Sequence, residues 1–256
     1  MRVVKALLVL FLLLVIGLAV VFHGVPARAW VAWLLPSNSA LELEGVEGSL
    51  VSGHAAQVRW RGRVIGPVNW RLHPLALVEQ RVQVDLDLQG DVYAGKGFVD
   101  VGRDQVIRLR DVSLRLPAEH LAGLIDTPAL QLLGYLQVGI ETAELNHLFP
   151  TALRGQVVWK DAAVMGAAQA EFGEVRMDFE RGADGRVVGE VHDGGGPLQI
   201  EQGQFSADLS GLQAKARLRA RDGNAQVQQA LAYIGQPQAD GSSLFELQAK
   251  LIGNSP

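Results

Sequence analysis

The fold class is decided by the stretch Arg81-Val82-Gln83-Val84-Asp85-Leu86-Asp87-Leu88-Gln89, in which apolar and polar residues alternate without a break. Successive side chains of an extended strand point to opposite faces, so this alternation predicts a β-strand with one apolar and one polar face. We predict that the apolar face forms part of a groove. It consists of Val82, Val84, Leu86 and Leu88.

The same period of two recurs further along the chain, in residues 107–116, 136–140, 175–179 and 214–221. Within residues 107–116 the apolar positions change parity at Arg110-Asp111, which predicts a β-bulge in one strand or a break between two. Turn-forming residues such as Gly90-Asp91 and Ala183-Asp184-Gly185 separate the runs. Half-buried strands joined by short turns indicate a mainly β fold with a large antiparallel sheet.

Two helices are predicted beyond residue 40. One runs from Pro117 to Leu124 and the other from Asn224 to Ile234, with Asn224 as the N-cap. The apolar face of the second consists of Val227, Ala230, Leu231 and Ile234. Two short helices cannot cover the apolar face of a large sheet, which must then close into a barrel, fold into a sandwich or stay open as a groove. The alternation does not choose between these three.

A long apolar segment precedes the sheet. Residues 6–22 are all apolar or glycine, and flanking valines extend the run to about 20 residues, enough to cross ~30 Å of hydrocarbon as a helix. Arg2 and Lys5 precede the run and only Arg28 follows closely, which places the N-terminus in the cytoplasm and the remainder outside it. Ala27-Arg28-Ala29 resembles a cleavage site, but the run exceeds the usual ~7–15 residues of a signal peptide. We therefore predict a retained anchor, with cleavage as the alternative.

This reading divides the chain into residues 1–25 as cytoplasmic start and anchor, 26–39 as membrane-proximal linker and 40–256 as an exported β domain. A repeated sequence pattern divides the β domain further. Residues 66–71 and 155–160 share the pattern Gly-x-Val-x-Trp-basic. We predict two related halves, residues 40–150 and 151–256, in which Trp70 and Trp159 occupy corresponding, largely buried positions.

Composition excludes several kinds of chemistry. Beyond residue 22 the chain carries 21 basic and 27 acidic residues, since Arg2 and Lys5 are the only charges before that point. This net charge of −6 gives no reason to expect a nucleic acid partner. The absence of cysteine excludes disulfides and thiolate catalysis. The six histidines show no metal-binding spacing, and Gly194-Gly195-Gly196-Pro197 lacks the rest of a phosphate-binding motif. We predict no enzymatic activity, no metal and no cofactor.

Two sets of basic residues alternate with other residues, as the side chains on one strand face do. The first set is Arg59, Arg61 and Arg63, and the second is Lys215, Arg217, Arg219 and Arg221. Each could contact anionic headgroups or an acidic partner, but we favour the interpretation that they form a solvated sheet surface.

Several motifs resemble one protein family. Val25-Pro26-Ala27 is similar to a "Leu-Pro-Ala" that follows the membrane helix in type II secretion system protein N, and residues 46–53 resemble that family's "Val-x-Gly-Thr-Leu-Trp-Ser-Gly". Here Val25, Ser49 and Val51 replace the family's Leu, Thr and Trp. Residues 65–74 are similar to the family's "Gly-x-Val-x-Trp-x-Leu-x-Pro". The motif residues are Gly48, Leu50, Gly53, Gly66, Trp70, Pro74, Gly155, Trp159, Gly195 and Gly196.

The resemblance implies a non-enzymatic accessory component of type II secretion in the cell inner membrane. Its single-pass anchor would leave the bulk of the chain in the periplasm, where its partners would be other secretion subunits. The β domain is also similar to curved β-groove proteins related to lipid transfer. That likeness makes a lipid-binding groove the alternative function and membrane lipid an alternative partner. A likeness at the level of fold predicts function poorly, so this second expectation needs evidence from the site itself.

Overall fold

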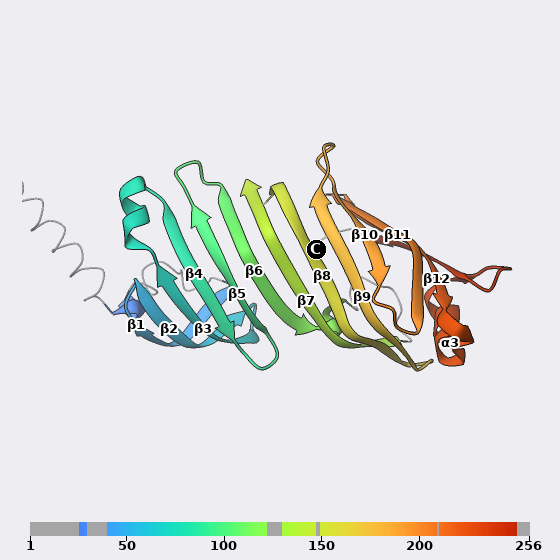
Figure 1. The fold of residues 1–256 in the computed structure, drawn as a ribbon. Coiled ribbons are helices and arrows are strands. Elements are labelled where there is room, and N and C mark those ends of the chain that lie inside the picture. The colour runs from blue at the N-terminus through green and yellow to red at the C-terminus, as the bar shows by residue number, and fades with distance from the viewer. Residues whose placement is uncertain (1–25, 30–39, 122–129, 147–148, 209, 250–256) are drawn as a thin grey trace, which may run out of the picture. The chain divides into compact units, whose positions relative to one another are not determined.

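The computed structural model describes residues 26–29, 40–121, 130–146, 149–208 and 210–249, and it is mainly β (Figure 1). The chain divides into two compact units, and the division falls between Arg103 and Asp104 in the sequence. This boundary lies inside the first predicted half, and the relationship between the two halves stays a prediction. The predicted anchor, residues 1–25, lies outside the described residues. Within the described ranges, no helix is long and apolar enough to cross a membrane.

Unit 1, residues 1–103, is an antiparallel meander in which each strand pairs with the next. Its strands are β1 (Leu41–Gly48), β2 (Ser52–Trp60), β3 (Arg63–Leu72), β4 (Val82–Gln89) and β5 (Ala94–Val101). The predicted strand at residues 81–89 is therefore confirmed as β4. Its apolar face is only partly covered, because Val82 and Leu86 remain 46% and 40% exposed. Leu86 lies opposite Trp70 of β3 and Gly97 of β5.

The connection between β2 and β3 corrects one expectation. Arg59 lies in β2, but Arg61 and Gly62 form a tight turn with positive φ angles of 50° and 77°, and Arg63 begins β3. Two consecutive residues in the left-handed region match the twist of a hairpin. The three arginines therefore do not form one row on a strand face. Arg61 instead lies over the Trp60 ring, 5.8 Å from its centroid.

Among its described residues, unit 2 (residues 104–256) contains nine strands, and all of them pair antiparallel. These are β6 (Ile107–Pro117), β7 (Leu130–Asn146), β8 (Phe149–Gly166), β9 (Ala170–Arg181), β10 (Val187–Asp193), β11 (Leu198–Asp208), β12 (Gly211–Ala220), β13 (Gln236–Pro237) and β14 (Ser243–Ala249). Each strand pairs with the next as far as β12, after which β14 and then β13 follow. In the part of the chain that the structure describes, the strand order ends at β13 and does not close on itself, so the sheet stays open.

Two local predictions in unit 2 are confirmed in part: β6 is a single strand whose register with β7 does not shift, and only part of the helix predicted over residues 117–124 is described. The parity change at Arg110-Asp111 lies within one continuous strand, β6, where Asp111 adopts a positive φ of 51° and pairing with β7 continues on both sides. The short helix predicted from Pro117 is present as the 3-10 helix η2 (Ala118–Leu121), and residues 122–129 lie outside the described residues.

The helix α3 (Ala225–Ile234) forms where the sequence predicts it. The Asn224 side chain accepts a hydrogen bond from the Val227 backbone N–H at 3.0 Å, which caps the first turn. Val227 and Ala230 are fully buried and Leu231 nearly so. The helix packs against both β9 and β12, which are not neighbours in the sheet. It therefore crosses the face of the sheet at one end and completes a core with residues of β7, β8, β9, β11 and β12 (Figure 1).

Candidate functional site

One face of the unit 2 sheet is apolar across six neighbouring strands. We call it the inner face, and it is the face of β9 that bears Val175, Met177 and Phe179. Because cross-strand partners point to the same side, the pairing registers define a continuous row on this face. From β8 to β14, the row consists of Gly155, Phe179, Gly189, Phe205, Ala214 and Leu247.

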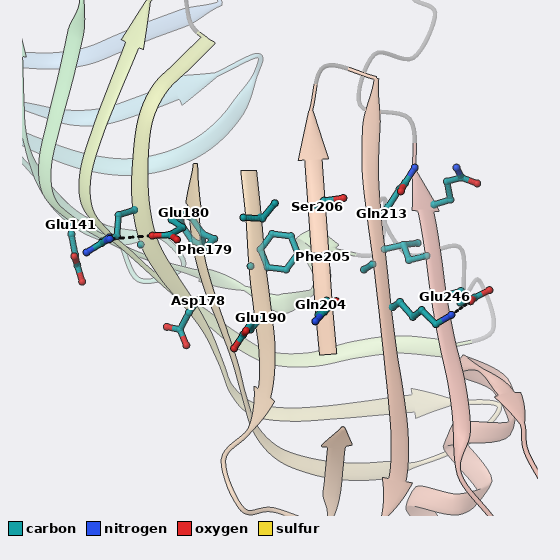
Figure 2. Close-up of a pocket in the computed structure, with 18 residues that line it drawn as sticks. Glu141, Asp178, Phe179, Glu180, Glu190, Gln204, Phe205, Ser206, Gln213 and Glu246 are labelled. Carbon is teal, nitrogen blue, oxygen red and sulfur yellow. Dashed lines mark hydrogen bonds and ion pairs between the residues drawn. The ribbon is translucent and has the colours of Figure 1, made fainter. Parts of the chain in front are cut away.

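Aromatic rings in this row lie over glycines of the neighbouring strand. A Cβ atom at Gly155 would come within 2.7 Å of the Phe179 ring, and one at Gly189 within 2.5 Å of the Phe205 ring. The rings cover the backbone of glycines, which have no side chain, and this arrangement helps to fix the strand register. Figure 2 shows Phe179 on β9 and Phe205 on β11, with β10 between them. In this row, the Phe179 and Phe205 rings therefore cover the backbone at Gly155 and Gly189.

The inner face surrounds a cavity of about 460 Å³, which we call the trough. Of its 25 lining residues all but Gln204 and Lys215 are apolar. Leu231 and Ile234 of α3 line it at the end where Leu198 and Leu218 are buried. Residues at the other end of the strands, among them Met177, Phe179, Phe205, Leu212 and Leu247, are only half-buried. A volume of this size and an apolar lining are typical of small-molecule sites, which span roughly 300–1,000 Å³.

A second, wider hollow of about 970 Å³ adjoins the trough and shares Phe179, Phe205 and Leu247 with it. Its five acidic side chains come from four strands, β7, β9, β10 and β14, and do not converge (Figure 2). Two of them form ion pairs, Glu180 with Arg154 at 3.1 Å and Glu246 with Lys215 at 3.0 Å. Across the described residues, no three His, Asp or Glu side chains gather as metal ligands would. The wider hollow therefore adds a polar margin to one end of an apolar site.

Side chains of the same unit neutralise the second basic set, of which Lys215, Arg217 and Arg219 lie on β12 and Arg221 begins the 3-10 helix η3 (Arg221–Gly223). Its partners are Glu246 for Lys215, Asp240 for Arg217, Asp240 and Glu201 for Arg219, and Asp193 for Arg221. The Ser242 hydroxyl and backbone N–H, together with Arg219 and Arg217, lower the pKa of Asp240 from 3.8 to about 2. This carboxylate therefore stays ionised and holds the loop before β14 against β12. The arrangement favours a solvated, charge-balanced surface over a surface for anionic headgroups.

A family model described as type II secretion system (T2SS), protein N, matches residues 39–244. The chain belongs to this family. It is thereby a component of type II secretion. It is 33% identical over 152 residues to the type II secretion system protein N of Vibrio cholerae serotype O1, a match that covers 57% of this chain and 59% of that protein. The protein of the same name from Aeromonas hydrophila is 26% identical over 255 residues, which cover 95% of this chain and 97% of that protein. No solved structure matches.

The two tryptophans of the family motifs make the same contact. The Trp70 indole N–H donates to the Leu50 carbonyl at 3.2 Å, and the Trp159 indole N–H donates to the Leu133 carbonyl at 2.7 Å. In each case the acceptor precedes the cross-strand partner of the tryptophan by three residues, the partners being Gly53 and Leu136. Both rings are partly buried. These are observations in favour of the predicted duplication, which itself stays a prediction.

The other family-motif residues serve local structure and do not converge on one site. Gly48 lies at the β1–β2 turn with a φ of +84°, which favours glycine, and Gly53 lies so close beneath Trp70 that a Cβ atom would be 2.2 Å from the ring. Gly66 and Gly196 approach neighbouring backbone closely, Gly195 lies in the turn after β10, and Pro74 begins the helix η1 (Pro74–Glu79). Trp159 lines the trough and Gly155 lines the wider hollow.

Several trough residues were not predicted as site residues, notably Phe205, Leu212, Phe245 and Leu247. A signal for them exists in the sequence, because Phe245 and Leu247 alternate with Glu246 and Gln248 as the residues of β4 do. The predicted groove face at Val82, Val84, Leu86 and Leu88 belongs to unit 1 and does not line the trough. Its role as a groove stays a prediction.

Proposed function

We propose that this chain is a non-enzymatic accessory component of type II secretion that is anchored in the inner membrane and acts by binding other subunits from the periplasmic side. Membership of the family over residues 39–244 carries the proposal, since that range contains nearly all the described strands. The apolar run before residue 26, with Arg2 and Lys5 ahead of it, supports the anchor and its orientation.

The margin of unit 2 is the surface that we propose for a subunit contact. On one side β14 pairs with β12 along its whole length, but on the other side β13 pairs only with Ser243 and Leu244. Within the described part of the chain, residues 245–249 therefore have no strand neighbour on that side. An uncovered strand edge offers backbone N–H and C=O groups to a partner strand, which adds to the sheet by β-augmentation.

In-cell photo-crosslinking tests this contact. A photoreactive residue replaces Gln248, which is exposed on β14 beside the open edge, and a matched one replaces Gln156, which is exposed in the interior of the same sheet on β8. We expect adducts to another secretion subunit from position 248 and not from position 156. Equal adduct yields at both positions, or none at 248, would contradict the proposed contact.

The trough supports a second candidate, a lipid-binding role. Apolar residues make up 23 of its 25 lining positions, and those remote from α3 remain half-exposed, so an acyl chain could enter without unfolding the sheet. Met177 and Asp178 give a matched pair of probe positions, because they are adjacent on β9 and point to opposite faces. Adducts with the mass of a phospholipid at position 177 and not at 178 would support the role. Crosslinks from 177 within the chain alone would rule it out.

A further inference from the structure

The helix η1 carries the two most exposed large apolar side chains in the described part of the chain. Leu75 is 84% exposed and Val78 is 82% exposed, whereas Val92, which comes next, is 55% exposed. Residues three apart in a 3-10 helix lie on the same side, so the two side chains form one apolar protrusion. We call this pair the η1 knob. Large apolar groups held together in water mark a contact surface more often than isolated ones do.

The knob is held in place by its own backbone. Ala76 is 7% exposed, its N–H donates to the His73 carbonyl at 3.2 Å, and its carbonyl accepts from the Arg81 N–H at 3.0 Å. The last turn is closed by a bond from the Gln80 N–H to the Leu77 carbonyl at 3.0 Å. Because η1 is fixed at both ends, little conformational entropy remains to be lost when its exposed side meets a partner.

The position of the knob identifies the partner. Pro26 forms a β-bridge with Ser49 in the β1–β2 turn, and Leu72, at the end of β3, donates its N–H to the Val51 carbonyl in that turn at 2.7 Å. Since η1 begins two residues after Leu72, the knob and Pro26 lie at the same end of the unit 1 sheet. Three strand spacings of about 4.8 Å separate them laterally by ~15 Å. Pro26 directly follows the predicted anchor segment, residues 1–25.

We propose that Leu75 and Val78 insert into the surface of the lipid bilayer that holds the apolar N-terminal run. The inference rests on the proposed anchorage, because an anchor that ends one residue before Pro26 brings a bilayer surface to this end of unit 1. Apolar side chains that reach the interface gain by leaving water. A single span would let unit 1 pivot about residue 26. The knob adds a second attachment, so that the η1 end of the sheet faces the membrane.

The absence of cysteine allows a direct test with the full chain. Single cysteines at Leu75 and Val78 are labelled with an environment-sensitive fluorophore, and the chain is reconstituted into vesicles of phosphatidylethanolamine and phosphatidylglycerol. Val92 provides the matched control, because it is exposed in the β4–β5 turn at the opposite end of unit 1. We expect nitroxide-labelled lipids to quench the labels at 75 and 78 several-fold more than the label at 92, and aqueous iodide to show the reverse order.

A second variant separates insertion from mere proximity. With the label at the exposed neighbour Glu79, the substitutions Leu75→Ser and Val78→Ser together remove the apolar side chains that would be buried in lipid. We expect them to weaken the membrane contact equilibrium by about tenfold or more, seen as loss of lipid quenching. Unchanged lipid quenching in this variant would overturn the proposal.

Three other outcomes would also overturn it. Labels at 75 and 78 that iodide quenches as well as the label at 92 would place the knob in water. Labels shielded from both quenchers would mean that protein covers the knob, for example residues 30–39 of this chain. If the chain is released from the vesicles by an alkaline wash, the anchorage itself fails, and that result is distinct from failure of the knob alone.

Discussion

The substitution Asp100→Ala tests how unit 1 holds its sheet together. Asp100 of β5 is 1% exposed, and its carboxylate accepts hydrogen bonds from the Arg81 guanidinium at both oxygens and from the Gln83 amide at 3.4 Å. Removing one partner of a buried ion pair costs ~3–5 kcal/mol, because the other charge is left without compensation. The Arg81 side chain is 38% exposed and can regain part of its hydration. We therefore expect Asp100→Ala to lower the free energy of unfolding by roughly 2–3 kcal/mol, at or below the lower end of that range.

Urea unfolding of the full chain in detergent, followed by tryptophan fluorescence, measures this loss. Asp87→Ala is the control, because Asp87 is exposed on β4 and should change the free energy of unfolding by less than ~0.5 kcal/mol. The double variant Arg81→Met/Asp100→Leu removes both charges and should recover most of the loss. A loss below ~0.5 kcal/mol for Asp100→Ala, or a double variant as unstable as the single one, would refute the reasoning about the buried charge.

Three further outcomes are expected. Asn224→Ala should destabilise unit 2 by about 1 kcal/mol through loss of the N-cap, and Asn224→Asp should be nearly neutral, as thermal unfolding can show. Trp159→Phe should cost about 1 kcal/mol in urea unfolding, because the Leu133 carbonyl loses its indole donor. Folding lowers the pKa of Asp240 from 3.8 to about 2, so the stability that Asp240 adds is complete above its unfolded pKa and is lost as the pH falls through the folded one. The difference in unfolding free energy between wild type and Asp240→Asn should therefore shrink between pH 4 and pH 2, and a constant difference would contradict the assignment.

Local features of this fold could be predicted from the sequence, because short-range patterns determine them. Strict alternation predicted β4, a parity change predicted the irregularity at Asp111, and an N-cap with helical spacing predicted α3 and its buried face. The arginine row around Arg61 was wrong, since alternation continued through a hairpin turn that contains none of the usual Asn-Gly or Asp-Gly signals.

The candidate site depends on contacts that a local pattern does not contain. Alternation marked the inner-face residues of β9 and β12, but only the pairing register shows that Phe179 and Phe205 lie over glycines of neighbouring strands. Alternation also could not decide between a sandwich, a barrel and an open sheet. That outcome depends on whether the first and last strands of the sheet pair with each other, which is a non-local property of the chain.

The apolar row on the inner face has a consequence for any hydrocarbon ligand that the trough holds, as proposed. Rings, methyl groups and glycine backbone line the row from Gly155 to Leu247, and hydrophobic contact with such a surface has no preferred direction. A chain lying there would slide lengthwise by one carbon at a time against little friction. Among the described residues that line the trough, Leu231 and Ile234 of α3 close one end of it. Such a site would select its occupant by chain length and not by the chemistry of the head group.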